Sequence, residues 1–554
     1  MVWTRLTERL ADALRATSLF TPERLERLEL AIPRDPAHGD WTTNLALLIA
    51  REVGRAPRAV AEAIASAFST EGSPFGAVEV AGPGFLNFRY SEAFLRGLPA
   101  DIAAAGEGFG SSRQPGAHRI QIEYVSANPT GPLNVVNARA AAVGAALVRL
   151  LRATGHDAEG EFYVNDAGTQ VELLGESVAS RCAELVGMPR AFPEDGYKGG
   201  YIRDIARALP VDEARARLGE GEVEWFRDRA LEQMLAWQRD DLARYGAEFA
   251  RWFRETELHR SGAVTETLEA LRAKEMTYVD EGAEWVRTSR FGDDKDRVVM
   301  RSSGAPTYLL PDIAYHRDKR ARGFQTVVDL WGPDHHGHIL PLKAALAALG
   351  FEPTFLEVLI VQQVNLLSGG QPVRMSKREG EFITLRDLME DVGPDCAKFF
   401  FLLRSTSAHL DFDLDLAKRQ NDENPAYYVQ YAHARIASIL RFAAERGLAP
   451  ASQAASDFAA PEERALIRRL AAFPEVVRGA AVAREPHRIP AFLMDTAADF
   501  HRFYHACRVV SEDAALSRDR LLLAQAARLV IRNGLALMGV SAPERMERTG
   551  EAVT

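Results

Sequence analysis

The spacing of apolar positions changes at a few points along the chain, and these changes divide it into four parts. In residues 1–112, helical spacing at 6–16, 43–53 and 58–68 gives way to alternating apolar and polar residues around a Gly-Pro-Gly turn at 77–90. The first pattern predicts helices and the second a pair of strands. Residues 1–112 are therefore predicted to form a small α+β domain.

Strand-like and helix-like segments alternate between residues 113 and 372. Strands are predicted at 119–125, 159–166, 326–332 and 355–361, and helices at 136–153 and 339–349. This order indicates a Rossmann-like, doubly wound parallel sheet, which binds ligands at the carboxyl ends of its strands. Helical, highly charged segments at about 185–295 interrupt the order and are predicted to be an insertion.

Helical spacing alone remains from residue 411 to the end, at 427–446, 462–477, 490–510 and 521–537. An all-α helical bundle is predicted for 411–554, with a loop and junction at 373–410. The run Asp411, Asp413, Asp415 alternates as metal ligands can, but a solvated strand or turn is expected there. The chain as a whole is predicted to be a multidomain α/β protein.

Composition and charge agree with an ordinary globular protein. The chain has 554 residues, of which 47% are hydrophobic and 26% charged, and its length suggests about three to four domains. The apolar runs are far shorter than the ~20 residues that span a bilayer, and the N-terminus lacks a signal-peptide core. With three scattered cysteines, these features predict a cytoplasmic protein without disulfides or membrane contact. A net charge of −10 argues against indiscriminate nucleic-acid coating, and no DNA partner is expected.

Three polar segments follow predicted strands of the sheet. The first contains Glu123, Ser126 and Asn128 and continues as SANPTGPLN into a helix start, where free N–H groups suit an anion such as a triphosphate. The alternative is a tight turn in which Ser126 and Asn128 satisfy backbone groups.

The second segment is WGPDHHGH at 331–338, in which Asp334 can accept hydrogen bonds from a ribose. Its three histidines raise the question of a metal, but neighbouring residues point in different directions and no further ligand completes a site, so none is predicted. The alternative is a capped helix with histidines in its first turn. The third segment, RMSKR at 374–378, places Lys377 in a loop suited to closing over a polyphosphate; a solvated basic loop is the alternative.

Together these segments resemble the signatures of class I aminoacyl-tRNA synthetases, and specifically of arginyl-tRNA synthetases. SANPTGPLN stands in the place of the first signature and RMSKR in that of the K-M-S-K-S loop. The segments PAHGDWTTNLALLIAREVGRAPRAVAEAI and VEVAGPGFLNF resemble the family's N-terminal domain. The family's catalytic, junction and anticodon-binding regions are similar to four further segments: EFYVNDAGTQVELL, REGEFITLRDLMEDVG, HLDFDLDLAKRQNDENPAYYVQYAHARI and IRNGLALMGVSAPERM.

The resemblance implies that the chain attaches L-arginine to tRNA(Arg) in two steps. ATP and arginine form arginyl-adenylate and pyrophosphate, and the arginyl group then passes to the 3′-terminal ribose with release of AMP. The substrate ATP would carry Mg²⁺ without dedicated protein ligands. Residues 1–112 would contact tRNA and 411–554 would read the anticodon, in a protein expected to be a monomer that needs bound tRNA before it activates arginine.

Residue correspondences with the family assign the sites. Arginine binding falls on Glu123, Ser126, Asn128, Tyr308 and Asp312, although Asp312 alone would read as the N-cap of a helix from Ile313. ATP binding falls on Asn134, Asn137, Gly332, Asp334, His338, Met375, Ser376 and Lys377, and catalysis on Lys377, Asn134 and Asn137. Stacking on tRNA bases falls, with the weakest support, on Tyr427, Tyr428 and Tyr431.

One segment departs from the family, which has His-Val-Gly-His where this chain has Asn134-Val-Val-Asn137. The asparagine amide donates hydrogen bonds but carries no positive charge. The loss of a charge-assisted contact costs on the order of 1–2 kcal/mol, roughly ten- to thirty-fold in rate. The alternatives are a non-catalytic tRNA-binding paralogue and a synthetase for another amino acid, lysine being the closest competitor. The retained pocket acids, WGPDHH segment and Lys377 favour an active arginine enzyme.

Overall fold

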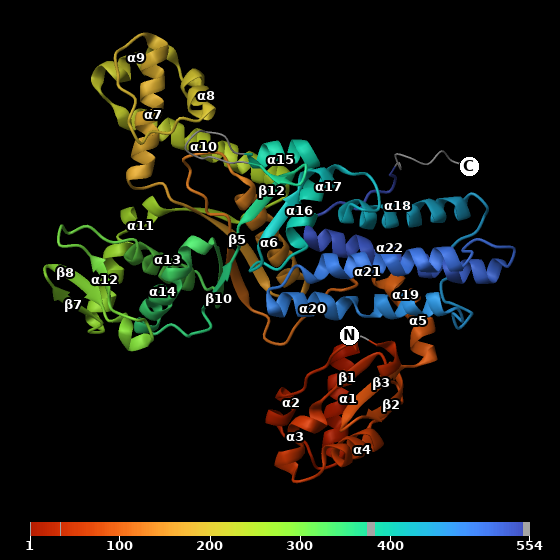
Figure 1. The fold of residues 1–554 in the computed structure, drawn as a ribbon. Coiled ribbons are helices and arrows are strands. Elements are labelled where there is room, and N and C mark those ends of the chain that lie inside the picture. Colours follow the sequence, from red (N-terminus) through yellow and green to blue (C-terminus); the bar gives the residue numbers. More distant parts are fainter. Residues whose placement is uncertain (1, 34, 374–382, 547–554) are drawn as a thin grey trace.

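The computed structural model describes residues 2–33, 35–373 and 383–546. Its N-terminal part is a small antiparallel sheet covered by helices (Figure 1). The strands β1 (Trp41–Thr43), β2 (Phe75–Ala81) and β3 (Phe85–Tyr90) pair in the order β1-β3-β2. The helices are α1 (Val2–Ala16), α2 (Pro22–Glu26), α3 (Leu45–Val53) and α4 (Pro57–Ala67), and α5 (Glu92–Ala105) leads to the rest of the molecule. The predicted α+β character of this part is confirmed.

A five-stranded parallel sheet forms the centre of the molecule. It contains β4 (Arg119–Glu123), β5 (Asp157–Val164), β6 (Arg251–Arg254), β10 (Thr326–Trp331) and β11 (Leu356–Ile360), in the order β11-β10-β4-β5-β6. Val327 and Val328, adjacent on β10, are both fully buried but belong to different apolar clusters, because alternate side chains point to opposite faces. The order changes direction between β4 and β10, which creates the crevice where such sheets bind ligands.

Helices cover both faces of this sheet. The buried side of α6 (Val135–Ala153) packs in the larger apolar cluster, whereas α13 (Leu309–Ala321) and α14 (His336–Ala348) pack in the other. The doubly wound fold predicted from the sequence is therefore confirmed.

The predicted insertion at about 185–295 is only partly helical. The helices α7 (Thr169–Val186), α8 (Gly200–Ala208), α9 (Val211–Glu220) and α10 (Val223–Tyr245) form a projecting module with its own apolar cluster (Figure 1). The chain then rejoins the central sheet as β6 and continues through α11 (Glu255–Ser261), α12 (Ala263–Ala273) and an antiparallel sheet of β7 (Thr277–Asp280), β8 (Ala283–Val286) and β9 (Arg297–Met300). The prediction of one charged helical block was wrong there, because four-residue strands are too short to show a period.

The C-terminal part joins a small sheet to a helical bundle. The small sheet contains β12 (Val364–Ser368), β13 (Gln371–Pro372) and β14 (Leu410–Asp413), and its helices are α15 (Leu385–Val392), α16 (Pro394–Leu402) and α17 (Leu414–Lys418). Asp413 caps α17 by accepting from two backbone N–H groups, so the acidic run is a strand end and a helix cap, as expected.

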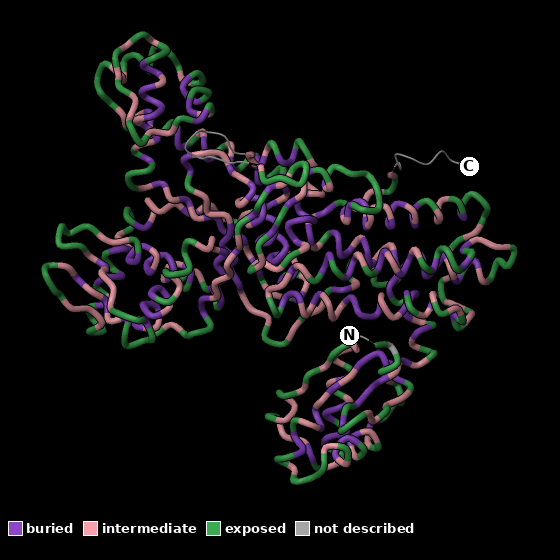
Figure 2. Tube along the Cα trace, viewed as in Figure 1, coloured by how far each residue is buried: buried purple, intermediate pink, exposed green. Residues whose placement is uncertain are grey.

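The bundle consists of α18 (Pro425–Ala444), α19 (Pro461–Ala471), α20 (Phe473–Ala483), α21 (Arg488–Ala506) and α22 (Ala514–Met538). The helix predicted at 462–477 is in fact two, which meet at Ala472 just before Pro474. A proline fits best in the first turn of a helix, and Pro474 lies there in α20. By length and composition α22 could cross a membrane, but 67% of its apolar window is buried inside the protein (Figure 2).

Candidate active site

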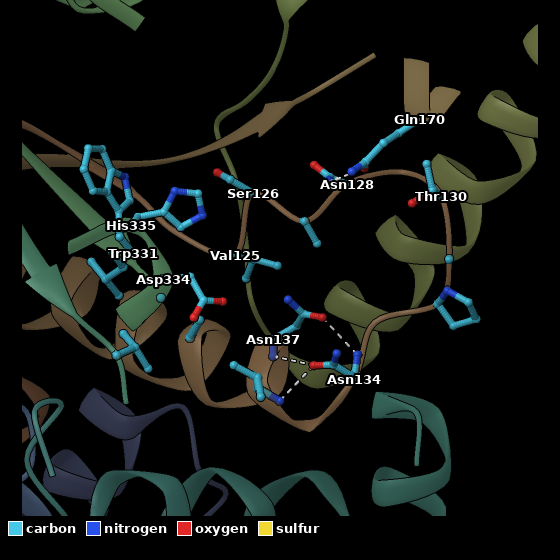
Figure 3. A pocket seen from close by; sticks show the side chains of 18 of the residues that line it. Val125, Ser126, Asn128, Thr130, Asn134, Asn137, Gln170, Trp331, Asp334 and His335 are labelled. Atoms are coloured by element: carbon cyan, nitrogen blue, oxygen red, sulfur yellow. Dashed lines mark hydrogen bonds between the residues drawn. The ribbon is translucent and has the colours of Figure 1, made fainter. Parts of the chain in front are cut away.

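A pocket of about 520 Å³ lies at the carboxyl ends of β4 and β10, where the strand order reverses (Figure 3). Its volume is that of a site for a nucleotide-sized ligand. Three groups of residues line it: the loop after β4 with the start of α6, the segment after β10, and side chains from the projecting module. They include Ser126, Asn128, Asn134, Asn137, Gln170, Tyr197, Tyr201, Trp331, Gly332 and Asp334.

Asn134 and Asn137 form a reciprocal cap at the start of α6. The Asn134 Oδ1 accepts from the backbone N–H groups of Val136 (2.9 Å) and Asn137 (3.1 Å), while the Asn137 Oδ1 accepts from the Asn134 N–H (3.0 Å) (Figure 3). Asparagine is among the best N-caps, so this departure from the family's histidines is favourable for the helix. Both oxygens are used inside the cap, and the Nδ2 amides are the donors that a ligand can meet.

After the RMSKR segment, the chain returns to the start of α6. The backbone N–H of Leu385 donates to the Leu133 carbonyl (2.8 Å), and Thr384 forms a β-bridge with Asn134. The segment that carries RMSKR is therefore tied to the first signature at its C-terminal end. Met375, Ser376 and Lys377 lie outside the described residues.

The loop between β4 and α6 is fixed by the projecting module. The Tyr201 hydroxyl donates to the Thr130 carbonyl (2.8 Å), Gln238 of α10 donates to the Gly131 carbonyl (3.1 Å), and Asn128 donates to Gln170 (2.7 Å). Val125 and Ser126 adopt positive φ angles of 70° and 37°. A β-branched residue at such an angle is strained, and strain of this kind persists only where surrounding contacts enforce it.

Glu123 does not line the pocket directly but lies behind it in a buried ion-pair cluster. Its Oε2 accepts from Lys319 Nζ (2.6 Å) and its Oε1 from the Ser126 hydroxyl (3.0 Å). Burial raises the pKa of Glu123 although Lys319 opposes this. Lys319 also donates to Asp329 (3.0 Å), whose other oxygen lies 2.9 Å from His316 Nε2. Burial raises the pKa of Asp329, but the charge of Lys319 and the hydrogen bonds from His316 and Lys319 outweigh it and leave that pKa lowered.

Tyr308 and Asp312 lie at the start of α13. The helix begins at Leu309, so Asp312 lies in its first turn, and its reading as the N-cap of a helix from Ile313 was wrong. The Asp312 carboxylate, one third exposed, meets His338 Nε2 at 2.7 Å. Tyr308 is 76% exposed. The structure thus brings Asp312 to His338, which sequence reasoning had placed with ATP, while Asp334 and Gly332 line the pocket with Asn134 and Asn137.

The tyrosines predicted to contact tRNA lie on α18 of the bundle. Tyr427 is buried and its ring stacks on Tyr431 with centroids 5.8 Å apart, so packing is part of its role. Arg435, one turn further, lies over the rings of Tyr431 (4.8 Å) and Tyr504 (5.4 Å). The ring centres of Tyr428 and His501 lie 5.2 Å apart.

Several residues at these places were missed from the sequence. Arg435 continues the four-residue spacing of Tyr427 and Tyr431 and could have been found from it. Tyr197 and Tyr201 lie in the YKGGY stretch of the module, where nothing in the sequence indicates contact with a loop 70 residues earlier. Lys319 is one of only eight lysines in the chain, but its partners are far away in sequence.

Comparisons with known proteins identify the family. Residues 104–398 match the family model described as tRNA synthetases class I (R), catalytic domain, residues 4–90 the arginyl tRNA synthetase N terminal domain, and residues 429–546 the DALR anticodon binding domain. The fold and the site thus define a class I aminoacyl-tRNA synthetase. The chain belongs to the arginyl-tRNA synthetase family, whose members are arginine–tRNA ligases.

Individual relatives match over nearly the whole length. The arginine–tRNA ligase of Geobacillus kaustophilus is 44% identical over 98% of both chains, and that of Heliobacterium modesticaldum is 47% identical over 93% of both. Among solved structures, a putative arginyl-tRNA synthetase from Campylobacter jejuni superposes with a TM-score of 0.76 at 34% identity, covering 82% of this chain and all of that one.

Proposed function

We propose that the pocket at the start of α6 binds ATP, with Asn134 and Asn137 facing its phosphates. The observation that carries this is the reciprocal cap, which uses both side-chain oxygens and leaves the amide donors beside the positive end of α6. Asp334 and Gly332, across the pocket, suit the ribose and base. Met375, Ser376 and Lys377 of the third signature complete the phosphate site, and Lys377 acts as its cation.

The amino acid binds beside the nucleotide. Ser126 and Asn128 suit the ammonium and carboxylate end of arginine, because they lie in the pocket wall next to the phosphate site. Asp312 suits the guanidinium, since a carboxylate pairs with it bidentately, and Tyr308 suits packing beside it. Attack of the arginine carboxylate on the α-phosphate forms arginyl-adenylate and releases pyrophosphate, and transfer to the tRNA ribose releases AMP.

Mg²⁺ fits as an ion carried by the phosphates of ATP. Among the described residues, no group of three or more His, Cys, Asp or Glu side chains gathers to hold a metal ion, and Asp334 is the one carboxylate in the pocket wall that they provide. When bound, Mg²⁺ would neutralise the charge of the pyrophosphate that leaves.

The flanking parts of the molecule suit the tRNA. Residues 1–112 are proposed to contact it outside the active site, and 411–554 to read the anticodon. Tyr428 beside His501 and Tyr431 beside Arg435 would offer a surface for bases. We expect a cytoplasmic monomer that contacts neither membrane nor DNA. The relatives give no support to the non-catalytic alternative.

The experiment that tests this function is arginine-dependent exchange between ATP and labelled pyrophosphate, with and without tRNA(Arg). Exchange is expected only with arginine and with tRNA present, and lysine should not replace arginine. Tight tRNA binding without any exchange would refute the proposal and favour the binding paralogue. Exchange supported equally by lysine would refute the arginine pocket.

A further inference from the structure

Lys319 is a completely buried lysine that the reaction described above does not use. Its side chain has no exposed surface, and Nζ donates to Glu123 at 2.6 Å and to Asp329 at 3.0 Å. Nζ also lies 4.2 Å from the ring centre of Tyr315, one turn earlier on α13. It therefore joins three elements of the fold, β4, β10 and α13, immediately behind the pocket.

The charges around it keep this lysine cationic. Burial by itself lowers the pKa of a lysine, but Asp329 and Glu123 outweigh that effect and leave the pKa of Lys319 raised. A buried charge is tolerated when it is paired and hydrogen-bonded, and both conditions are met here. A protein seldom buries lysine otherwise.

The pairing occupies the acid that the family resemblance assigned to the substrate. One oxygen of Glu123 is taken by Lys319, and the other accepts from the Ser126 hydroxyl at 3.0 Å. Ser126 in turn accepts from the backbone N–H of Tyr163 on β5 at 3.1 Å. Because Val125 and Ser126 have positive φ angles, these bonds are what holds a strained turn in the pocket wall.

We propose that Lys319 is a positioning residue for arginine activation: it is the permanent counter-ion of Glu123, so that Glu123 fixes the Ser126 turn instead of binding the guanidinium. Asp312 is then left as the carboxylate that selects the substrate's cation. This inference rests on the proposed function and deepens it, because it divides the two acids into one that supports the pocket and one that contacts arginine.

The ionisable groups that surround Glu123 come from every element packed against it. They are Lys319, His316 and Tyr315 of α13, Asp329 of β10, and Tyr163 and Glu161 of β5, of which Glu161 is the register partner of Glu123 and is itself paired with Arg322. Of these, Lys319 is the cation in direct contact with Glu123. Without it, two buried carboxylates face each other, and Glu123 takes up a proton at a higher pH than before.

The first test compares Lys319→Met with the parent chain in tRNA-dependent exchange at several pH values. We expect the variant to lose about tenfold in kcat at pH 7. The ratio of variant to parent rate should rise with pH, since the ionised Glu123 is a stronger acceptor for the Ser126 hydroxyl than the protonated acid, whose proton also needs a partner in the buried cluster. Lys274→Met, the same change at an exposed lysine, serves as the matched control and should give a flat ratio near one.

A second pair of variants separates the role of Glu123 from a loss of folding. In Lys319→Met/Glu123→Gln the neutral amide still offers an oxygen to Ser126, so the pH dependence of the ratio should disappear and part of the rate should return. Glu123→Gln alone should change the arginine KM less than about threefold, whereas loss of a charged contact to the guanidinium would raise it about tenfold to hundredfold.

The outcomes are distinct. A Lys319→Met rate ratio that is independent of pH in a folded protein, or a large rise of the arginine KM in Glu123→Gln, would overturn the inference. A pH dependence that persists in the double variant would also overturn it, because it would then arise from Asp329. A parent chain without exchange refutes the proposed function itself, while an active parent with a flat ratio refutes only the role of Lys319.

Discussion

At the scale of single residues, Asn134 and Asn137 cap α6 but lack the positive charge that histidines can carry at these positions. Histidines would bring a cation to the phosphates, whereas the asparagines secure the start of α6 and leave neutral donors there. The backbone N–H groups and the dipole of α6 supply partial positive charge in the same place. In the proposed ATP site, the start of α6 would supply part of the positive charge that a histidine side chain supplies in the family's signature.

This division of roles predicts opposite effects for two substitutions of Asn134. Asn134→Asp keeps the capping oxygen, so thermal unfolding should be unchanged or slightly later, but the new negative charge should reduce exchange by about tenfold to hundredfold. Asn134→Ala removes the cap and should cost about 1 kcal/mol of unfolding free energy. Full exchange activity in Asn134→Asp would mean that this side chain does not face the phosphates.

Residue positions in the pocket were predictable where they follow a strand directly. Asp334 comes soon after β10, and Asn134, which was assigned from the resemblance to the family, lies in the segment after β4; both line the pocket, while their roles toward ATP stay predictions. The pairing of Glu123 with Lys319, 196 positions away, was not predictable, because no periodic pattern links residues across such a separation. His338 was assigned to ATP by correspondence with the family, and only the fold shows it beside Asp312.

At the scale of elements, α10 and α15 frame the pocket together. Arg386 of α15 donates to Asp241 of α10 at 2.7 and 2.8 Å and to Asp240 at 2.9 Å. Gln238, one turn earlier on α10, holds the loop after β4, and α15 follows the third signature. The contact therefore links the two signature segments through a pair of helices.

Removal of Arg386 should loosen this frame. Asp241 is almost fully buried, and burial raises its pKa against the opposing effect of Arg386, so the carboxylate depends on that partner. Arg386→Met should cost about 1–2 kcal/mol in chemical denaturation and raise the KM for ATP. Adding Asp241→Asn should restore the stability, since no buried charge is then left unpaired. A stable Arg386→Met protein with unchanged KM would show that the frame is not needed.

Elements were predictable in proportion to their length. The helices α6 and α18 and the strands β4, β5, β10 and β11 were found close to their observed bounds, because each shows a clear period or a continuous apolar run. The strands β6 to β9 have four residues each; β6 to β8 were taken for part of a helical block, and β9 lies just past the predicted end of that block. β6 shows that even a strand of the central sheet can be hidden in this way, since its pairing with β5 is a long-range contact.

At the scale of the whole molecule, ion pairs, α5 and apolar packing attach the N-terminal part to the bundle. Arg468 of α19 donates to Asp40 at 2.7 Å, Arg464 of α19 pairs with Glu92, and Arg96 donates to Asp457 at 3.0 Å. Asp40 is buried and also accepts from the Tyr90 N–H at 2.7 Å. A tRNA that contacts both parts would therefore meet them in a fixed relative orientation, which lowers the entropy lost on binding.

The pair of Arg468 with Asp40 should accordingly matter for tRNA more than for the small substrates. In Arg468→Ala the buried Asp40 carboxylate loses its cation, and the two parts are held less firmly. The KM for tRNA in aminoacylation should rise by about threefold to tenfold, while the KM values for arginine and ATP change little. Arg488→Ala, which breaks an exposed pair with Glu485 inside the bundle, should leave all three unchanged. Neither Asp40 nor Arg468 lines the pocket. An equal loss for all three substrates would therefore point to damage of the catalytic domain and contradict a role in tRNA positioning.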